Sequence, residues 1–148
     1  MNKFMLEAIK SANEGIKSKD GGPFGCCIVD SNDNIIAVAH NNVLGNNDPT
    51  AHAEIEAIRI AGEKINSYDL KDCKLYTTCE PCPMCLFAIM WANIKGVYYG
   101  CNRVDAADIG FRDEKFYEMI KDIDNINLYN IDREECLKLF KDYNNKIY

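Results

Sequence analysis

The chain has 148 residues, 47% hydrophobic and 27% charged, which suits a single globular domain spanning residues 1–148. Its net charge of −6 argues against nucleic acid as a partner and favours a small molecule, because nucleic-acid binders usually carry a basic patch. No apolar run reaches the length of a membrane-spanning helix, so no membrane partner is expected. Residues 1–4 lead directly into a helical pattern without a cleavage site, so we expect a cytoplasmic protein.

Hydrophobic periodicity predicts helices and strands that alternate along the chain. Two apolar runs flank the turn-forming residues 31–33, which is typical of a β-hairpin. The predicted elements are, in order, a helix at 2–18, strands at 24–30 and 34–40, a helix at 51–64, a strand at 73–78, an apolar and therefore buried helix at 83–93, a strand at 96–100, a helix at 113–121, a strand at 126–130 and a helix at 132–144. This order predicts an α/β fold whose sheet is covered by helices on both faces.

Most of the eight cysteines are expected to have a structural role. They come without a secretion signal, which indicates free thiols in a reducing compartment rather than a disulfide framework. We expect five of them to be small buried hydrophobic residues, namely Cys26, Cys27, Cys73, Cys101 and Cys136.

Two short motifs carry the chemical information: His-Ala-Glu at 52–54 and Pro-Cys-Pro-Met-Cys at 81–85. A catalytic zinc site has three protein ligands and leaves a position for water, and His52, Cys82 and Cys85 make three. H-x-E followed by P-C-x-x-C is the signature of zinc-dependent base deaminases. The sequence therefore predicts a catalytic Zn²⁺ site, with one ion per subunit.

The positions of the motifs favour this chemistry. Both fall at predicted helix starts, where unpaired N–H groups stabilise anions and therefore thiolates. Zinc lowers the pKa of a bound water from about 15.7 to about 7. Glu54, separated from His52 by one residue, can take that proton and pass it to a leaving amine. A structural zinc site would instead need a fourth ligand, for which Cys79 and His40 are the candidates.

In these motifs the chain resembles the cytidine deaminase-like superfamily and, within it, the bacterial guanine deaminases. The resemblance is carried by Gly-Gly-Pro-Phe-Gly at 21–25, Asn-Asp-Pro-Thr-Ala-His-Ala-Glu at 47–54, the segment 75–86 and Asp-Ala-Ala-Asp-Ile-Gly-Phe at 105–111. It implies a three-layer αβα sandwich with a mixed five-stranded sheet. It also implies hydrolysis of guanine to xanthine and ammonia by zinc hydroxide, with Glu54 as the proton shuttle.

The resemblance also assigns roles to individual residues. His52, Cys82 and Cys85 hold zinc and Cys79 has no metal role; the catalytic residues are Glu54 and Asp113, and the substrate-binding residues are Asn41, Phe24, Ala53 and Tyr148. Tyr148 would reach the partner's site in a homodimer through a swapped C-terminal segment, about residues 119–148.

Four of these residues have simpler alternative roles. Asn41 could end a strand in a turn, and Phe24 could be a core residue. Asp113 could cap a helix, and Arg112 before it departs from the family pattern, so the register there is open by one residue. Tyr148 could be part of a frayed terminus.

Three alternative functions remain open. A tRNA adenosine deaminase would use the same zinc chemistry on a flipped-out base. Such enzymes usually carry Leu at the position of Cys79 and Pro-Val-Gly in place of residues 23–25, and they tend to be basic. A related aminopurine or triazine could be the substrate instead of guanine. In a non-catalytic module, zinc would only stabilise the fold.

Overall fold

The computed structural model describes residues 1–123 and 126–148, which form two compact units, Met1–Glu118 and Met119–Tyr148. The elements that lie wholly in the first unit are α1 (Lys3–Ser18), β1 (Gly25–Val29), β2 (Ile35–His40), α2 (Val43–Asn46), α3 (Ala53–Ile65), β3 (Lys74–Cys79), α4 (Pro83–Trp91), β4 (Gly96–Cys101) and α5 (Arg103–Asp108). Helix α6 (Asp113–Ile120) runs across the boundary, and α7 (Arg133–Asp142) lies in the second unit.

The first unit is built around a mixed sheet with the strand order β2-β1-β3-β4. Strand β1 pairs antiparallel with both β2 and β3, and the predicted hairpin is confirmed by the pairing of Cys26 with Ala39. Strands β3 and β4 run parallel, with Leu75 opposite Val97. The helix α4 connects these two strands, as parallel neighbours require a crossover.

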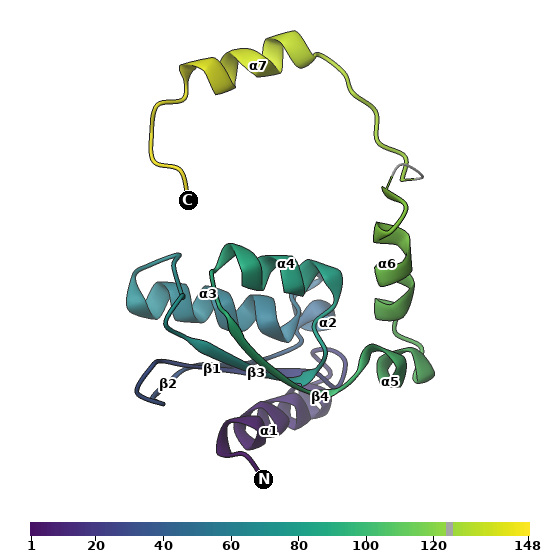
Figure 1. Ribbon diagram of the computed structural model, residues 1–148. Helices are drawn as coiled ribbons and strands as arrows, with labels where there is room; N and C mark the ends of the chain where they lie inside the picture. The colour runs from purple at the N-terminus through teal and green to yellow at the C-terminus, as the bar shows by residue number, and fades with distance from the viewer. Residues whose placement is uncertain (124–125) are drawn as a thin grey trace. The chain divides into compact units, whose positions relative to one another are not determined.

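Helices cover both faces of this sheet, and together they form the three expected layers (Figure 1). On one face Cys27 and Val29 of β1 pack in a cluster with Phe4 and Ala8 of α1. On the other face the alternate β1 residues belong to a larger cluster with alanines of α3 and with Ile89 of α4. All five β1 residues are buried, because a strand presents successive residues to opposite faces and helices cover both faces here.

The ends of α1 follow simple capping rules. Asn2 accepts hydrogen bonds at Oδ1 from the backbone N–H groups of Phe4 and Met5, at 2.9 and 3.1 Å. Lys19 closes the helix in the left-handed conformation at φ 61°. The chain then turns at residues 20–24 and enters β1 beneath the helix it has just left.

Two predictions about the helices and strands are wrong. The sheet in the described residues has four strands rather than five, because the expected strand at 126–130 pairs with no other strand there and exposes Leu128 and Tyr129. The apolar helix α4 is not fully buried: Phe87, Met90 and Trp91 are 48, 61 and 67% exposed, because only one of its faces packs on the core.

Two of the five cysteines expected to be buried are exposed in the structure. Cys101 ends β4, whose last four residues are all exposed on the edge of the sheet, and Cys136 lies on α7. The short helices α2 and α5 were not predicted, because four and six residues are too few to display a hydrophobic period. None of the helices in the described residues is long and apolar enough to cross a membrane.

Candidate active site

His52 stands immediately before α3, at the N-cap position. The loop that leads to it is fixed by Asp48, whose Oδ1 accepts hydrogen bonds from the backbone N–H and hydroxyl of Thr50 at 2.8 and 2.7 Å. The N–H of His52 donates to the carbonyl oxygen of Thr50 at 2.7 Å. These contacts place the imidazole at the end of the sheet from which α3 departs.

Cys82 occupies the corresponding position at the start of α4, and Cys85 follows one turn later. Pro83 is the first helical residue, where its fixed φ suits the helix and its missing N–H costs no hydrogen bond. Both sulfur atoms therefore lie at the positive end of a helix, which stabilises a thiolate. The prediction that the two motifs begin helices is confirmed.

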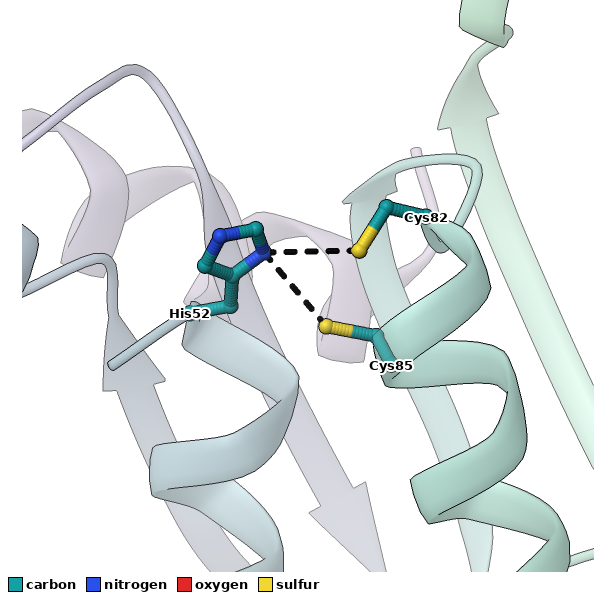
Figure 2. Close-up of side chains that lie close together, drawn as sticks. All are labelled: His52, Cys82 and Cys85. Carbon is teal, nitrogen blue, oxygen red and sulfur yellow. Dashed lines mark hydrogen bonds between the residues drawn. The ribbon is translucent and has the colours of Figure 1, made fainter. Parts of the chain in front are cut away.

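The three side chains converge from the two helix starts, as Figure 2 shows. Nδ1 of His52 lies 3.6 Å from Sγ of Cys82 and 3.5 Å from Sγ of Cys85, and all three donor atoms lie within 4.8 Å of one another. In a tetrahedral site with Zn–S bonds of about 2.3 Å and Zn–N bonds of about 2.1 Å, a nitrogen and a sulfur ligand are about 3.6 Å apart. The donor set therefore fits a zinc ion in both chemistry and spacing.

The acid–base properties of the two thiols point the same way. Hydrogen bonds from Cys85 and His52 lower the pKa of Cys82 to about 4, although burial opposes this. The shared hydrogen bond and burial raise the pKa of Cys85 well above its usual range. The hydrogen bond to Cys82 raises the pKa of His52. A thiol whose pKa is lowered in this way gives up its proton more readily, and the thiolate is the form that binds a metal ion.

Glu54 lies in the first turn of α3 and is 6% exposed. Its Oε1 accepts a hydrogen bond of 2.9 Å from the hydroxyl of Thr77, which is completely buried in β3. Burial raises the pKa of the Glu54 carboxyl, while the Thr77 hydrogen bond acts in the opposite direction. A carboxyl group with a raised pKa takes up a proton more readily, which suits it to general acid–base work.

A small pocket opens beside the metal-ligand cluster. It is lined by Phe24, His52, Glu54, Cys79, Glu80, Cys82 and Asp113. Phe24 is steadied by an edge contact with the ring of Phe111, at 4.7 Å between centroids. Burial, followed by the charge of Cys82, raises the pKa of Asp113. The structure therefore brings Phe24 and Asp113 to the same cavity as Glu54.

The start of α6 is tied to the loop that carries Cys82. The hydroxyl of Tyr117 donates a 2.5 Å hydrogen bond to the carbonyl oxygen of Pro81. The guanidinium of Arg103 lies 3.9 Å from the centre of the Tyr117 ring, and its Nε is 3.3 Å from a carboxylate oxygen of Glu80. Arg112 lies over the ring of Phe116 at 5.0 Å and is not among the pocket residues, whereas Asp113 is.

The other candidate substrate residues lie outside the lining of this pocket. Asn41 is buried next to the end of β2, and its Oδ1 accepts a hydrogen bond of 3.2 Å from the N–H of Val43. Ala53 is completely buried between His52 and Glu54. Tyr148 belongs to the second unit and is 74% exposed.

Neither candidate for a fourth ligand belongs to the metal-ligand cluster found in the described residues. Cys79 Sγ lies 3.7 Å from the carbonyl oxygen of Asn102. His40 is engaged by two other side chains, Ser11 and Asp20. The donor set is thus the three-ligand type that leaves one position open, as in catalytic zinc sites.

Two residues of the site were not singled out from the sequence. Thr77 is a strand residue that lies 23 positions from Glu54 in the sequence, so no local sequence pattern predicts their contact. Glu80 directly precedes Pro81 and Cys82 and lines the pocket. Its place beside the motif could have identified it as a site residue.

The fold and this donor set define a zinc-binding α/β deaminase domain. The chain belongs to the family described by the cytidine and deoxycytidylate deaminase zinc-binding region, whose sequence profile matches residues 1–101. The resemblance proposed from the motifs is confirmed at this level.

Particular relatives extend the match beyond that region. The guanine deaminase of Bacillus subtilis (strain 168) is 46% identical over 148 residues, or 96% of this chain and 92% of the relative. The X-ray structure of guanine deaminase from B. subtilis superposes with a TM-score of 0.88 at 45% identity, and covers 100% of this chain and 99% of that one. The tRNA-specific adenosine deaminase of Buchnera aphidicola is 36% identical over 82% of this chain.

Proposed function

We propose that the chain is a zinc-dependent enzyme that hydrolyses guanine to xanthine and ammonia. The observation that carries this proposal is the three-donor cluster of His52, Cys82 and Cys85 beside the buried carboxyl of Glu54. The similarity to a guanine deaminase along almost the entire chain supports guanine as the substrate. One Zn²⁺ per subunit would be held by the three donors and would make a water molecule nucleophilic at neutral pH.

The protein's own groups then move the protons. Thr77 holds Oε1 of Glu54, which leaves the other carboxylate oxygen to accept a proton from water and deliver it to the substrate. The raised pKa of Glu54 makes both the acceptance and the release of that proton accessible. Asp113 enters the same pocket and would assist departure of ammonia as a second proton carrier.

Substrate binding is assigned to residues around this pocket. Phe24, whose ring is braced by Phe111, would stack on the purine face. The carboxamide of Asn41 would donate a hydrogen bond to the base, with its oxygen retained by Val43. We keep Ala53 as a candidate for the base site, although it is completely buried at the start of α3 between His52 and Glu54.

We also propose that the enzyme is a homodimer. Phe87 and Met90, one helical turn apart on α4, expose apolar surface at 48 and 61%, and Tyr99, on the same side of β4 as the Val97 that packs in the α4 cluster, is half exposed. A second copy is the occupant we assign to this surface, and Tyr148 of a swapped C-terminal segment would complete the partner's site. Light scattering should give a molar mass in solution of twice the chain mass. The Met90→Asp variant should have the mass of a single chain.

We propose a cytoplasmic location for the enzyme, because Cys82 and Cys85 must stay reduced to bind the metal ion. It assigns a free base rather than tRNA as the substrate, as the net charge of −6 is unfavourable for an RNA partner. Related aminopurines and triazines are the alternative substrates that the same pocket would accept.

A substrate panel tests this function. Zinc-loaded protein is offered guanine, 2,6-diaminopurine, ammeline, cytosine and an adenosine-containing tRNA anticodon stem-loop, and ammonia release is measured for each. The proposal predicts the highest kcat/KM for guanine. Release from the stem-loop alone would instead establish a tRNA adenosine deaminase, and release from none of them would favour a structural zinc module.

A further inference from the structure

Three polar side chains form a hydrogen-bonded array that the proposed reaction does not use. Nε2 of His40 lies 2.9 Å from Oδ2 of Asp20, and its Nδ1 lies 3.2 Å from the hydroxyl oxygen of Ser11. Ser11 comes from α1, Asp20 from the turn after it and His40 from the end of β2. The imidazole is therefore held at both nitrogens by groups from different parts of the fold.

The array is not suited to nucleophilic catalysis, although it contains the residue types of a serine hydrolase. Ser11 is 7% exposed in the middle of α1, so a substrate could not reach its hydroxyl. The imidazole ring also lies directly against Gly15: a Cβ there would come within 2.5 Å of Cδ2 of His40. The close packing points to a structural use of the hydrogen bonds.

Asp20 connects this array to the short helix α2. Its carbonyl oxygen accepts hydrogen bonds from the N–H groups of Leu44 and Gly45, at 2.8 and 3.0 Å. Its own N–H donates to the carbonyl oxygen of Gly15 at 2.9 Å. Asp20 thus joins the end of α1 to the turn that follows β2.

Asn41 lies between these two connected segments. It follows His40 directly, and its N–H donates to the carbonyl oxygen of Phe24 at 3.0 Å. The turn after Asp20 packs closely against the Asn41 side chain, since a Cβ at Gly21 would lie only 1.9 Å from Oδ1 of Asn41. With Oδ1 also held by Val43, a shift of either segment would move the Asn41 carboxamide.

We propose that His40 is a positioning residue that fixes the Asn41 carboxamide through Asp20 and the turn at residues 20–22. This inference rests on the proposed function for the role of Asn41 as the group that binds the base. Because Asn41 would hold the base equally in the ground state and the transition state, its displacement should raise KM and leave kcat nearly unchanged. We expect a rise on the order of tenfold, the value of one well-placed hydrogen bond.

The kinetic test compares three variants. His40→Ala removes both hydrogen bonds and should raise KM for guanine. His40→Gln can donate from its NH₂ group to Asp20 and accept from Ser11 with its oxygen, so it should restore most of the affinity. In the background of Asn41→Ala, the change at His40 should have no further effect on KM, because both act through one group. Additive effects on KM would overturn the proposal.

A spectroscopic measurement keeps this inference separate from the substrate assignment. The side-chain amide resonances of Asn41 are recorded in the zinc-loaded protein without substrate, using ¹⁵N labelling. They should shift in His40→Ala and return towards the wild-type position in His40→Gln. If the wild type does not act on guanine but the shift is seen, the proposed function fails and the positioning role stands. Unchanged resonances would overturn the positioning role.

A folding control completes the test. If His40→Ala does not fold, Asp20→Asn replaces it, since this change keeps the Asp20 backbone hydrogen bonds and weakens only the link to His40. It should raise KM and shift the Asn41 resonances in the same direction by a smaller amount. A lower melting temperature with neither change would mean that the array serves stability alone and would contradict the proposal.

Discussion

Thr77 donates a hydrogen bond of 2.9 Å to Glu54, and the exposed fractions of the two residues are 0 and 6%. A hydrogen bond in such a buried site both orients the carboxylate and stabilises its charge. The strand β3 therefore controls the group to which we assign proton transfer, although that group lies on α3.

We predict that Thr77→Val lowers kcat by about 10- to 100-fold, because the isosteric side chain leaves Oε1 of Glu54 without its donor. KM and zinc content should remain close to those of the wild type. Steady-state kinetics and metal analysis on the same preparation check this. In the comparison variant Thr78→Val, the lost hydrogen bonds are those of the neighbouring hydroxyl to the N–H of Gly25 and the carbonyl oxygen of Pro23, so its effect falls on the segment around Phe24 rather than on Glu54. Unchanged kcat in Thr77→Val would contradict the assignment.

A second prediction concerns the metal ligands. Cys85→Ala should reduce zinc to well below one ion per chain and abolish activity, because two protein ligands remain. Cys79→Ala should keep one zinc per chain, although Cys79 is also buried and lines the pocket beside the ligand cluster. Metal analysis after gel filtration distinguishes the two thiols. Loss of zinc from Cys79→Ala would mean that the site is closed by a fourth ligand.

Alkaline pH should destabilise the protein through its buried thiols. Burial raises the pKa of Cys27 from 9.0 to about 11. Between about pH 9 and pH 11 the folded protein keeps the Cys27 proton while the unfolded chain has lost it. The stabilisation from this thiol is therefore complete below about pH 9 and is lost as the pH rises towards 11. This single group contributes a slope of at most about 1.4 kcal/mol per pH unit.

Urea unfolding between pH 8 and pH 10.5 measures this slope. Cys27→Ala should reduce the slope by the share of this group, while Cys26 and Cys79, whose pKa values burial also raises, keep theirs. Cys136→Ala removes an exposed thiol and should leave the slope as in the wild type. Equal slopes in all three proteins would show that Cys27 titrates normally in the folded protein.

The link between α6 and the zinc-ligand loop gives a fourth prediction. Tyr117→Phe removes the hydrogen bond to the carbonyl oxygen of Pro81 while keeping the ring under Arg103. We expect the free energy of unfolding to fall by about 1 kcal/mol. We also expect kcat to fall several-fold, because Asp113 at the start of α6 loses part of its anchor. Chemical denaturation and kinetics check both, and an unchanged kcat would argue against a role for Asp113.

The sequence predicts the local parts of this molecule well. The hairpin of β1 and β2 and the starts of α3 and α4 follow from periodicity, turn residues and capping, all of which act over a few positions. The spacing of the two motifs on those helix starts was enough to indicate three converging donors. Local rules are reliable here because the helix ends themselves carry the chemistry.

Features that depend on distant contacts were not predictable. The expected strand at 126–130 has apolar residues but finds no partner strand in the described part of the chain, and partner availability is not a local property. The apolar sequence of α4 predicts a buried helix, but Phe87 and Met90 are exposed, because the number of helix faces that are covered depends on which elements pack against it. Thr77 became part of the site only through the packing of β3 beneath α3.

The most direct test of the central claim is the guanine-dependent release of ammonia by wild type and Glu54→Gln, with zinc measured in both samples. We predict about one zinc ion per chain in each protein, stoichiometric xanthine from the wild type, and a loss of kcat of at least about 1,000-fold in the variant. Activity in the zinc-replete variant close to that of the wild type would contradict the role of Glu54. No xanthine from a zinc-replete wild type would contradict the proposed function itself.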